Sequence, residues 1–228
     1  MFVSILGHDL RTPLGAIRLS AESIVRVSED VRALRPAGRI LTSADRISRM
    51  IEQLLDFARI RQGQGMALQI QVADLGDICR PVLQEIEDAN PDAKIDLVRL
   101  GDLSGAWDPD RVAQVVSNLT GNAVQHGTRG SPVTVTLDGV DPDRVRVRLE
   151  NRGLIEAEAL PTLFDAFKRS TRSGTGGDGL GLGLFIAREL ARAHGGDITV
   201  SSSEEVTLFE VSLPRVARPT KTAVSSPA

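Results

Sequence analysis

Residues 174–184 read GTGGDGLGLGL, and this run leads into a helix that the sequence predicts over 180–194. Six of the ten residues from Gly174 to Gly183 are glycines. Open backbone N–H groups at a helix N-terminus suit phosphate oxygens. The run is not a dinucleotide fingerprint, because no strand directly precedes it, and it lacks the Gly-Lys-Ser/Thr of a P-loop. A flexible linker is the alternative interpretation, but the leucines that alternate with glycines from Gly179 to Leu184 argue against it.

A second stretch, NLTGNAVQH at residues 118–126, lies in a helix that Pro109 is expected to begin. Asn118 and Asn122 are one turn apart on one face, and asparagine is a weak helix former. Their amide oxygens are suitable ligands for a hard cation such as Mg²⁺. Two solvent-facing asparagines are the alternative interpretation.

A third motif, ENRGLI at residues 150–155, follows a strand predicted over 145–149. A carboxylate or amide here could contact the edge of adenine, and Gly153 would permit close approach of the base. Ordinary turn chemistry after a strand is the alternative. Strand alternation places Glu150 and Asn151 on opposite faces, so only one of them can face the cleft. The residues leave open which one it is.

The first predicted helix carries HDLRTPL at residues 8–14. A neutral imidazole is a competent nucleophile, and Asp9 could hold the proton on the other ring nitrogen of His8. Thr12 lies one turn after His8 and could orient a water molecule. Pro13 is expected to kink the helix. A surface histidine beside a proline kink would give the same pattern.

Two helices make up the N-terminal part, the first with an apolar stripe from Leu6 to Leu34 and the second from Ile40 to Ala58, with a break at residues 35–38. The second helix has a heptad seam formed by Ile40, Ala44, Ile47, Ile51, Leu54 and Ala58. A lone antiparallel hairpin cannot bury this seam on all sides. We therefore expect a homodimer in which two hairpins form a four-helix bundle.

The rest of the chain mixes periods of two and of three to four residues, which predicts an α+β two-layer sandwich. Strands are expected at 68–72, 95–100, 105–108, 133–137, 145–149, 198–201 and 206–213, and helices at 75–90, 109–124 and 180–194. We divide the chain into a helical domain at 1–62, an α+β domain at 66–214 and a disordered tail at 215–228, which has no acidic residue.

Composition excludes several classes of protein. The chain has 228 residues, 41% of them hydrophobic and 25% charged, as in folded globular proteins. Its one cysteine, Cys79, excludes an internal disulfide framework. A net charge of −3 argues against nucleic-acid binding. No apolar run is long enough to span a membrane, and the first residues lack the charged start of a signal peptide, so we expect a soluble protein in a reducing compartment.

Taken in order, these motifs resemble those of two-component sensor histidine kinases over nearly the whole chain. The segments similar to the family's H box, N box, first glycine box, F box and second glycine box are, in turn, His8–Leu14, Asn118–Asn122, Asn151–Gly153, Phe164–Phe167 and Gly177–Leu184.

The resemblance implies a dimeric bundle followed by a Bergerat-type (GHKL) ATP-binding fold, with ATP and Mg²⁺ as cofactors. It implies that His8 is the phosphoacceptor, that Asp9 aids its deprotonation, and that Thr12 orients water in the reverse, phosphatase reaction. The partner implied is a response-regulator receiver domain, whose aspartate accepts the phosphoryl group. The residues implied in nucleotide binding are Asn118, Asn122, Gln125, His126, Asn151, Gly153, Lys168, Arg169, Gly177, Gly179, Leu180, Gly181, Leu182, Gly183 and Leu184, with Asn122 and Asn118 as the Mg²⁺ ligands.

The chain departs from the family pattern at three places. The adenine position is usually Asp, and Asn151 is the best match here. Gln125 and His126 replace a commoner Lys-aromatic pair, which removes one cation that would face phosphate. Only seven residues precede His8, so we expect an upstream sensor region outside this chain and a cytoplasmic location, with membrane attachment of the full-length protein left open.

Three other functions are compatible with parts of the sequence. A degenerate scaffold would keep the dimer without turnover, and only Asn151 favours it. An ATPase of the gyrase, Hsp90 and MutL type would require a Glu general base at the position of Asn118. That class of ATPase also has no H box. A protein-serine kinase of the anti-sigma kind would lack the helical hairpin.

Overall fold

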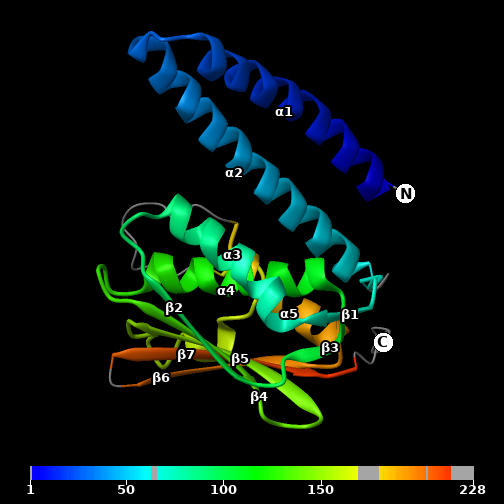
Figure 1. Cartoon of the computed structure of the whole chain (residues 1–228). Helices are drawn as coiled ribbons and strands as arrows, with labels where there is room; N and C mark the ends of the chain where they lie inside the picture. The colour runs from blue at the N-terminus through cyan, green and yellow to red at the C-terminus, as the bar shows by residue number, and fades with distance from the viewer. Residues whose placement is uncertain (1, 63–65, 169–179, 204, 217–228) are drawn as a thin grey trace.

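The computed structural model describes residues 2–62, 66–168, 180–203 and 205–216, with side chains from residue 10 onward. A long helical hairpin, formed by α1 (Phe2–Val27) and α2 (Val31–Arg61), stands on a domain in which helices cover a sheet (Figure 1). The predicted order of a helical hairpin and a two-layer α+β sandwich is confirmed. Within the described ranges, no helix has the length and apolarity that a membrane crossing requires.

The turn of the hairpin differs from the sequence prediction, which placed the break at residues 35–38. Helix α1 ends at Val27, and α2 begins at Val31 after Asp30, whose side chain accepts a hydrogen bond from the Arg32 N–H. Pro36 therefore lies inside α2. A proline removes only one helical hydrogen bond near a helix start, whereas an Asp N-cap satisfies an otherwise unpaired N–H. The cap, rather than the proline, decides where the helix begins.

In the described part of the chain, the main sheet has five strands in the order β2-β4-β5-β7-β6. Strand β2 is parallel to β4, and the other neighbours are antiparallel. A separate two-stranded sheet pairs β1 with β3. The strands are β1 (Gln71–Asp74), β2 (Ile95–Gly101), β3 (Ser104–Trp107), β4 (Val133–Gly139), β5 (Arg144–Arg152), β6 (Asp197–Ser203) and β7 (Val206–Pro214). The first strand begins later than the predicted 68–72, and the others lie close to their predicted positions.

Three helices cover one face of this sheet: α3 (Leu75–Ala89), α4 (Pro109–His126) and α5 (Gly183–Ala193). Helix α4 packs between α3 and α5 (Figure 1). Asp74 and Asp108 cap the first two helices as expected for Asp at this position. The core between the layers includes Trp107, Leu119, Leu149, Ile186 and Phe209, none more than 1% exposed. Each such side chain stabilises the fold by about 1.5–3 kcal/mol.

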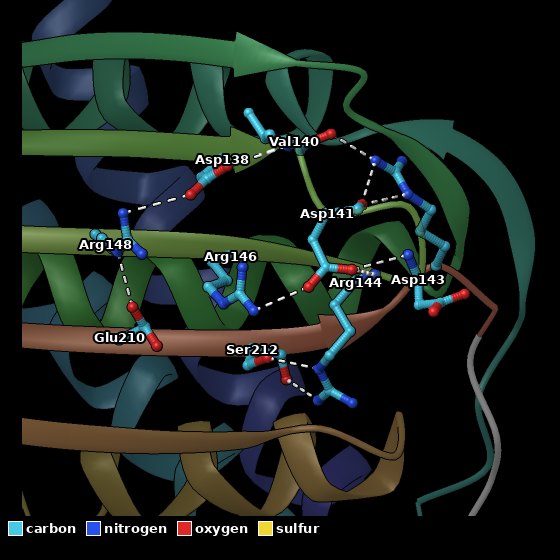
Figure 2. Close-up of polar contacts among 11 residues, drawn as sticks. Asp138, Val140, Asp141, Asp143, Arg144, Arg146, Arg148, Glu210 and Ser212 are labelled. Carbon is cyan, nitrogen blue, oxygen red and sulfur yellow. Dashed lines mark hydrogen bonds and ion pairs between the residues drawn. The ribbon is translucent and has the colours of Figure 1, made fainter.

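The other face of the sheet is polar, and β5 shows why. Its sequence RVRVR directs valines into the core and arginines outward. Figure 2 shows Arg148 between Asp138 and Glu210, with its Nε 2.7 Å from the Glu210 carboxylate. Arg146 binds Asp141 at 3.0 Å. These pairs, with partners on the neighbouring strands and in the β4–β5 turn, satisfy the arginines on a face that no described helix covers.

The end of the domain lies beyond the predicted boundary at residue 214. Arg215 donates hydrogen bonds to the carbonyls of Asp102, Ser104, Gly139 and Asp141. Val216 then forms a parallel bridge with Ala106. The sequence assigned both residues to a disordered tail, and this is wrong for them, because a guanidinium that donates to four backbone carbonyls is part of the fold. Residues 217–228 lie outside the described range.

Candidate active site

Helix α4 presents Asn118 toward the start of α5. The point where a β-carbon on Gly183 would stand is 3.5 Å from Asn118 Oδ1. The Nδ2 of Asn118 is buried and makes no hydrogen bond to any described residue. A buried polar atom without a partner destabilises the protein, so the free amide is suited to a ligand. Asn122, one turn later, is half-buried on the same side of the helix.

The N-terminus of α5 lies beside this amide and lacks a side-chain cap. Its N-cap residue is Leu182, which cannot accept a hydrogen bond from the first N–H groups. Gly181 adopts a φ of +70°, and its carbonyl accepts a 2.9 Å hydrogen bond from the Phe167 N–H. The helix begins at Gly183, three residues later than predicted from Leu180. The uncapped end supports the predicted suitability of this segment for anionic oxygens.

The structure separates Glu150 from Asn151. Glu150 is exposed, while Asn151 is 6% exposed on the face that the helices cover. The Nδ2 of Asn151 donates to the Arg152 carbonyl at 3.2 Å, and its Oδ1 is buried with no partner among the described residues. Asn151 also lines a cavity of about 450 Å³ between the C-terminal ends of α3 and α4. Its acceptor is thus held in a fixed orientation and remains available.

The backbone conformation itself requires a glycine at residue 153. Its φ is +148°, and a β-carbon there would lie 3.0 Å from the carbonyl oxygen of His126. The strand end therefore approaches the end of α4 closely, which keeps Asn151 beside that helix. The sequence predicted a close approach at Gly153, and the partner that the structure shows is α4.

Thr207 was not predicted from the sequence, yet it lies opposite Asn151 in the β5–β7 ladder. It is 3% exposed, and its Oγ1 donates to the Gly153 carbonyl at 2.7 Å. Ser202 Oγ lies 2.9 Å from the same hydroxyl. Alternation along β7 could have indicated an inward hydroxyl, but only the pairing register places it beside Asn151.

Charged side chains line the cavity beside Asn151, among them Lys94, Arg129 and Arg152. Burial of part of its ring lowers the pKa of His126, although the residue keeps more than a third of its surface exposed. Its imidazole is therefore neutral at pH 7 and adds no positive charge. Gln125 and Lys168 are exposed. The described residues contain no cluster of three or more His, Cys, Asp or Glu that could hold a metal. The amide oxygens of Asn118 and Asn122 stay the metal ligands that the sequence predicts.

For several predicted site residues, the structure describes the backbone without the side chain or does not describe the residue at all. His8 and Asp9 lie in α1, but their side chains are not described, and Thr12 is exposed on the same helix. Arg169, Gly177 and Gly179 lie outside the described ranges. Leu180 and Leu184 are half-buried against the core. The structure therefore brings together the asparagine and glycine motifs, and does not test the histidine motif.

Comparisons with known proteins follow the same division of the chain. Residues 1–63 match the family described as His Kinase A (phospho-acceptor) domain. Residues 107–217 match the family described as histidine kinase-, DNA gyrase B-, and HSP90-like ATPase. A bacteriophytochrome of Pseudomonas aeruginosa is 36% identical over 214 residues, which is 93% of this chain and 29% of the relative.

This chain belongs to the two-component sensor histidine kinases. The chain is also 35% identical over 223 residues to the probable sensor histidine kinase TcrY of Mycobacterium tuberculosis, covering 93% of this chain and 45% of that protein. It is 32% identical over 222 residues to the sensor protein VanSC of Enterococcus gallinarum, covering 93% and 60%. The chain therefore spans between 29% and 60% of the length of these three relatives.

Solved structures show the same fold. Full-length ShkA, crystallised with AMPPNP, superposes on this chain with a TM-score of 0.74 at 23% identity, over 96% of this chain and 46% of that one. The kinase ThkA in complex with the response regulator TrrA gives a TM-score of 0.61 at 21% identity, over 97% and 62%. Both likenesses cover the hairpin together with the α+β domain.

Proposed function

We propose that this chain is the catalytic region of a protein-histidine kinase that phosphorylates His8 with ATP and passes the phosphoryl group to an aspartate of a response regulator. The observation that carries the proposal is the order of the two family matches on one chain, together with the unpartnered amide atoms of Asn118 and Asn151. An ATPase that uses water would need a general base where Asn118 stands, and an amide cannot remove a proton.

In the proposed reaction a ring nitrogen of His8 attacks the γ-phosphorus of ATP, and the bond to the β–γ bridging oxygen breaks to release ADP. Asp9 holds the proton on the other ring nitrogen, so that the attacking nitrogen carries its lone pair. Catalysis then depends on positioning and on charge neutralisation. Thr12 orients a water molecule in the reverse, dephosphorylating direction. The partner's aspartate accepts the phosphoryl group from phosphohistidine.

The phosphate end of the nucleotide would lie between Asn118, Asn122 and the start of α5. The amide oxygens of the two asparagines suit Mg²⁺, which when bound would neutralise phosphate charge. The uncapped N–H groups of α5 provide further donors. Because His126 is neutral and Gln125 uncharged, this end of the site depends on the metal, on backbone N–H groups and on Lys168 and Arg169.

The adenine would contact Asn151 rather than Glu150. The Oδ1 of Asn151 is a buried acceptor without a partner, and the adenine amino group is a donor of matching polarity. The Nδ2 bond to Arg152 fixes which amide atom faces the base. Thr207 supports Asn151 from the neighbouring strand, and Gly153 holds both beside α4.

A second copy of the chain is the proposed partner of the hairpin. Exposed apolar residues recur every seven positions in both helices, at Leu10, Ile17 and Ile24 and at Ile40, Ile47 and Leu54, between 39% and 51% exposed. The buried alanines Ala21, Ala37 and Ala44 instead hold α1 against α2. Two such faces would bury each other in a four-helix bundle. We assign residues 1–62 to this dimerisation domain and place the whole region in the cytoplasm.

The test of the proposed activity is incubation with γ-labelled ATP and Mg²⁺. The label should appear on the protein, survive base and be lost in acid, as expected for a phosphohistidine. His8→Gln should abolish the labelling while the protein still binds nucleotide in a calorimetric titration. Labelling of the His8→Gln protein at the normal rate would refute the assignment of the phosphoacceptor.

A further inference from the structure

The end of α2 is fixed on the ATP-binding domain by a buried carboxylate. The side chain of Asp56 is only 7% exposed, although it lies on the hairpin. Its Oδ2 accepts a 2.9 Å hydrogen bond from Gln114 Nε2 and lies 3.4 Å from Arg111 Nη1, both on α4. Arg59 on α2 itself is 3.9 Å away. Burying a carboxylate is unfavourable unless it is paired in this way, so this contact determines where α2 lies.

Aromatic contacts hold Phe57, the residue that follows Asp56 in α2. The ring of Phe57 packs edge-on against Phe167 at 4.9 Å and against Phe185 at 5.6 Å between centroids. Phe185 belongs to the first turn of α5, and Phe167 has a φ of +64°, which a side-chain-bearing residue rarely adopts. The end of α2 is therefore anchored on α4 and at the start of α5.

Gln53 lies on this same face, because residues three and four positions apart on a helix are neighbours. The point where a β-carbon on Gly183 would stand is 3.8 Å from Gln53 Nε2 and 3.5 Å from Asn118 Oδ1. Gln53 is half-buried, and its amide makes no hydrogen bond to a described residue. A hairpin side chain with free donors thus lies at the phosphate end of the candidate nucleotide site.

We propose that helix α2 completes the nucleotide site with Gln53, whose amide N–H groups face the phosphates beside Asn118, and that Asp56 is the positioning residue that holds Gln53 there. The inference rests on the proposed ATP site. It follows that nucleotide affinity depends on whether α2 is docked, and by linkage nucleotide binding strengthens the docking by the same factor. A shift of α2 would change occupancy of the site without any change in the ATP-binding domain itself.

The test is a calorimetric titration of the whole chain with a non-hydrolysable ATP analogue and Mg²⁺. Loss of a hydrogen bond to a charged group predicts that Gln53→Ala weakens binding about tenfold. Gln53→Glu should weaken it further, because a carboxylate repels phosphate. Glu52→Ala is the matched control, since Glu52 is exposed on the adjacent position and should bind as the wild type does.

A double-mutant cycle separates the positioning role from a general structural effect. Asp56→Ala should weaken binding about as much as Gln53→Ala, and the double variant should be no weaker than either, because an undocked α2 no longer presents Gln53. Wild-type affinity in Gln53→Ala, or additive losses in the double variant, would overturn the inference. Absence of binding in the wild type would instead refute the proposed function.

Discussion

Replacement of Asn151 by alanine separates nucleotide affinity from the stability of the protein. The variant loses the acceptor for the adenine amino group, a neutral hydrogen bond of about 0.5–1.5 kcal/mol, which corresponds to a roughly two- to twelvefold weaker ATP complex. In the ATP-free protein, the substitution removes one hydrogen bond, the 3.2 Å bond from Nδ2 to the Arg152 carbonyl. It also loses a buried, unpartnered Oδ1, whose burial is unfavourable. We therefore expect weaker binding with a nearly unchanged melting temperature.

Replacement of Asn151 by aspartate tests the orientation of the amide. A carboxylate would accept a stronger, charge-assisted hydrogen bond from adenine, worth about 1.5–3 kcal/mol. Its second oxygen, however, would face the Arg152 carbonyl, where Asn151 now places a donor. The two effects oppose each other, so we expect ATP affinity within about tenfold of the wild type and a lower stability of the ATP-free protein.

Calorimetric titration with ATP, paired with thermal unfolding of the free protein, measures both quantities. Glu150→Ala is the control, because Glu150 is exposed on the opposite face. The reasoning is refuted if Glu150→Ala weakens ATP binding and Asn151→Ala does not. GTP binding should respond little to Asn151→Ala, since guanine has a carbonyl where adenine has its amine.

Three further predictions concern assembly and stability. Glutamate at both Ile47 and Leu54 should give monomers in sedimentation, and a monomeric wild type would contradict the proposed bundle. His194 is fully buried and accepts the Asp108 N–H at Nε2, and burial lowers its pKa. Below about pH 6.5, the histidine is protonated in the unfolded chain but stays neutral in the folded chain. The free energy of unfolding should therefore fall by up to about 1.4 kcal/mol per pH unit below that point. His194→Gln should flatten this dependence in unfolding titrations, and an unchanged slope would exclude His194 as its source. Arg215→Ala should lower the free energy of unfolding by about 3 kcal/mol, measured in denaturant, whereas an unchanged midpoint would show that its carbonyl contacts contribute nothing.

The sequence was informative wherever local chemistry decides the structure. Pro109 marked the start of α4, because a proline in the first helical turn lacks only an N–H that has no helical partner there. The alternation of Arg146, Val147 and Arg148 predicted a strand with one buried face. The glycines near residue 181 predicted an exposed helix N-terminus, and the structure shows α5 without a side-chain cap.

The remaining features depend on contacts between distant segments. The hairpin turn was misplaced at Pro36 because the relative strengths of a proline and an Asp cap cannot be read from a residue pattern. Asp56 and Gln53 looked like ordinary polar positions of a heptad, and only the docking of α2 gives them partners. Arg215 looks like part of a polar tail in the sequence, because the carbonyls that accept its hydrogen bonds come from distant strand ends and turns.

The pairing of β5 with β7 has a consequence for folding. Strands β4 and β5 form one hairpin and β6 and β7 another, so each pair joins neighbours in sequence, while β5 and β7 join segments far apart. Local hairpins close with a smaller loss of chain entropy than distant pairings. Asn151 and Thr207 are opposite each other in this β5–β7 pairing. We expect the adenine position to form only when the two halves of the sheet associate, so that recovery of nucleotide binding during refolding reports the last step rather than the first.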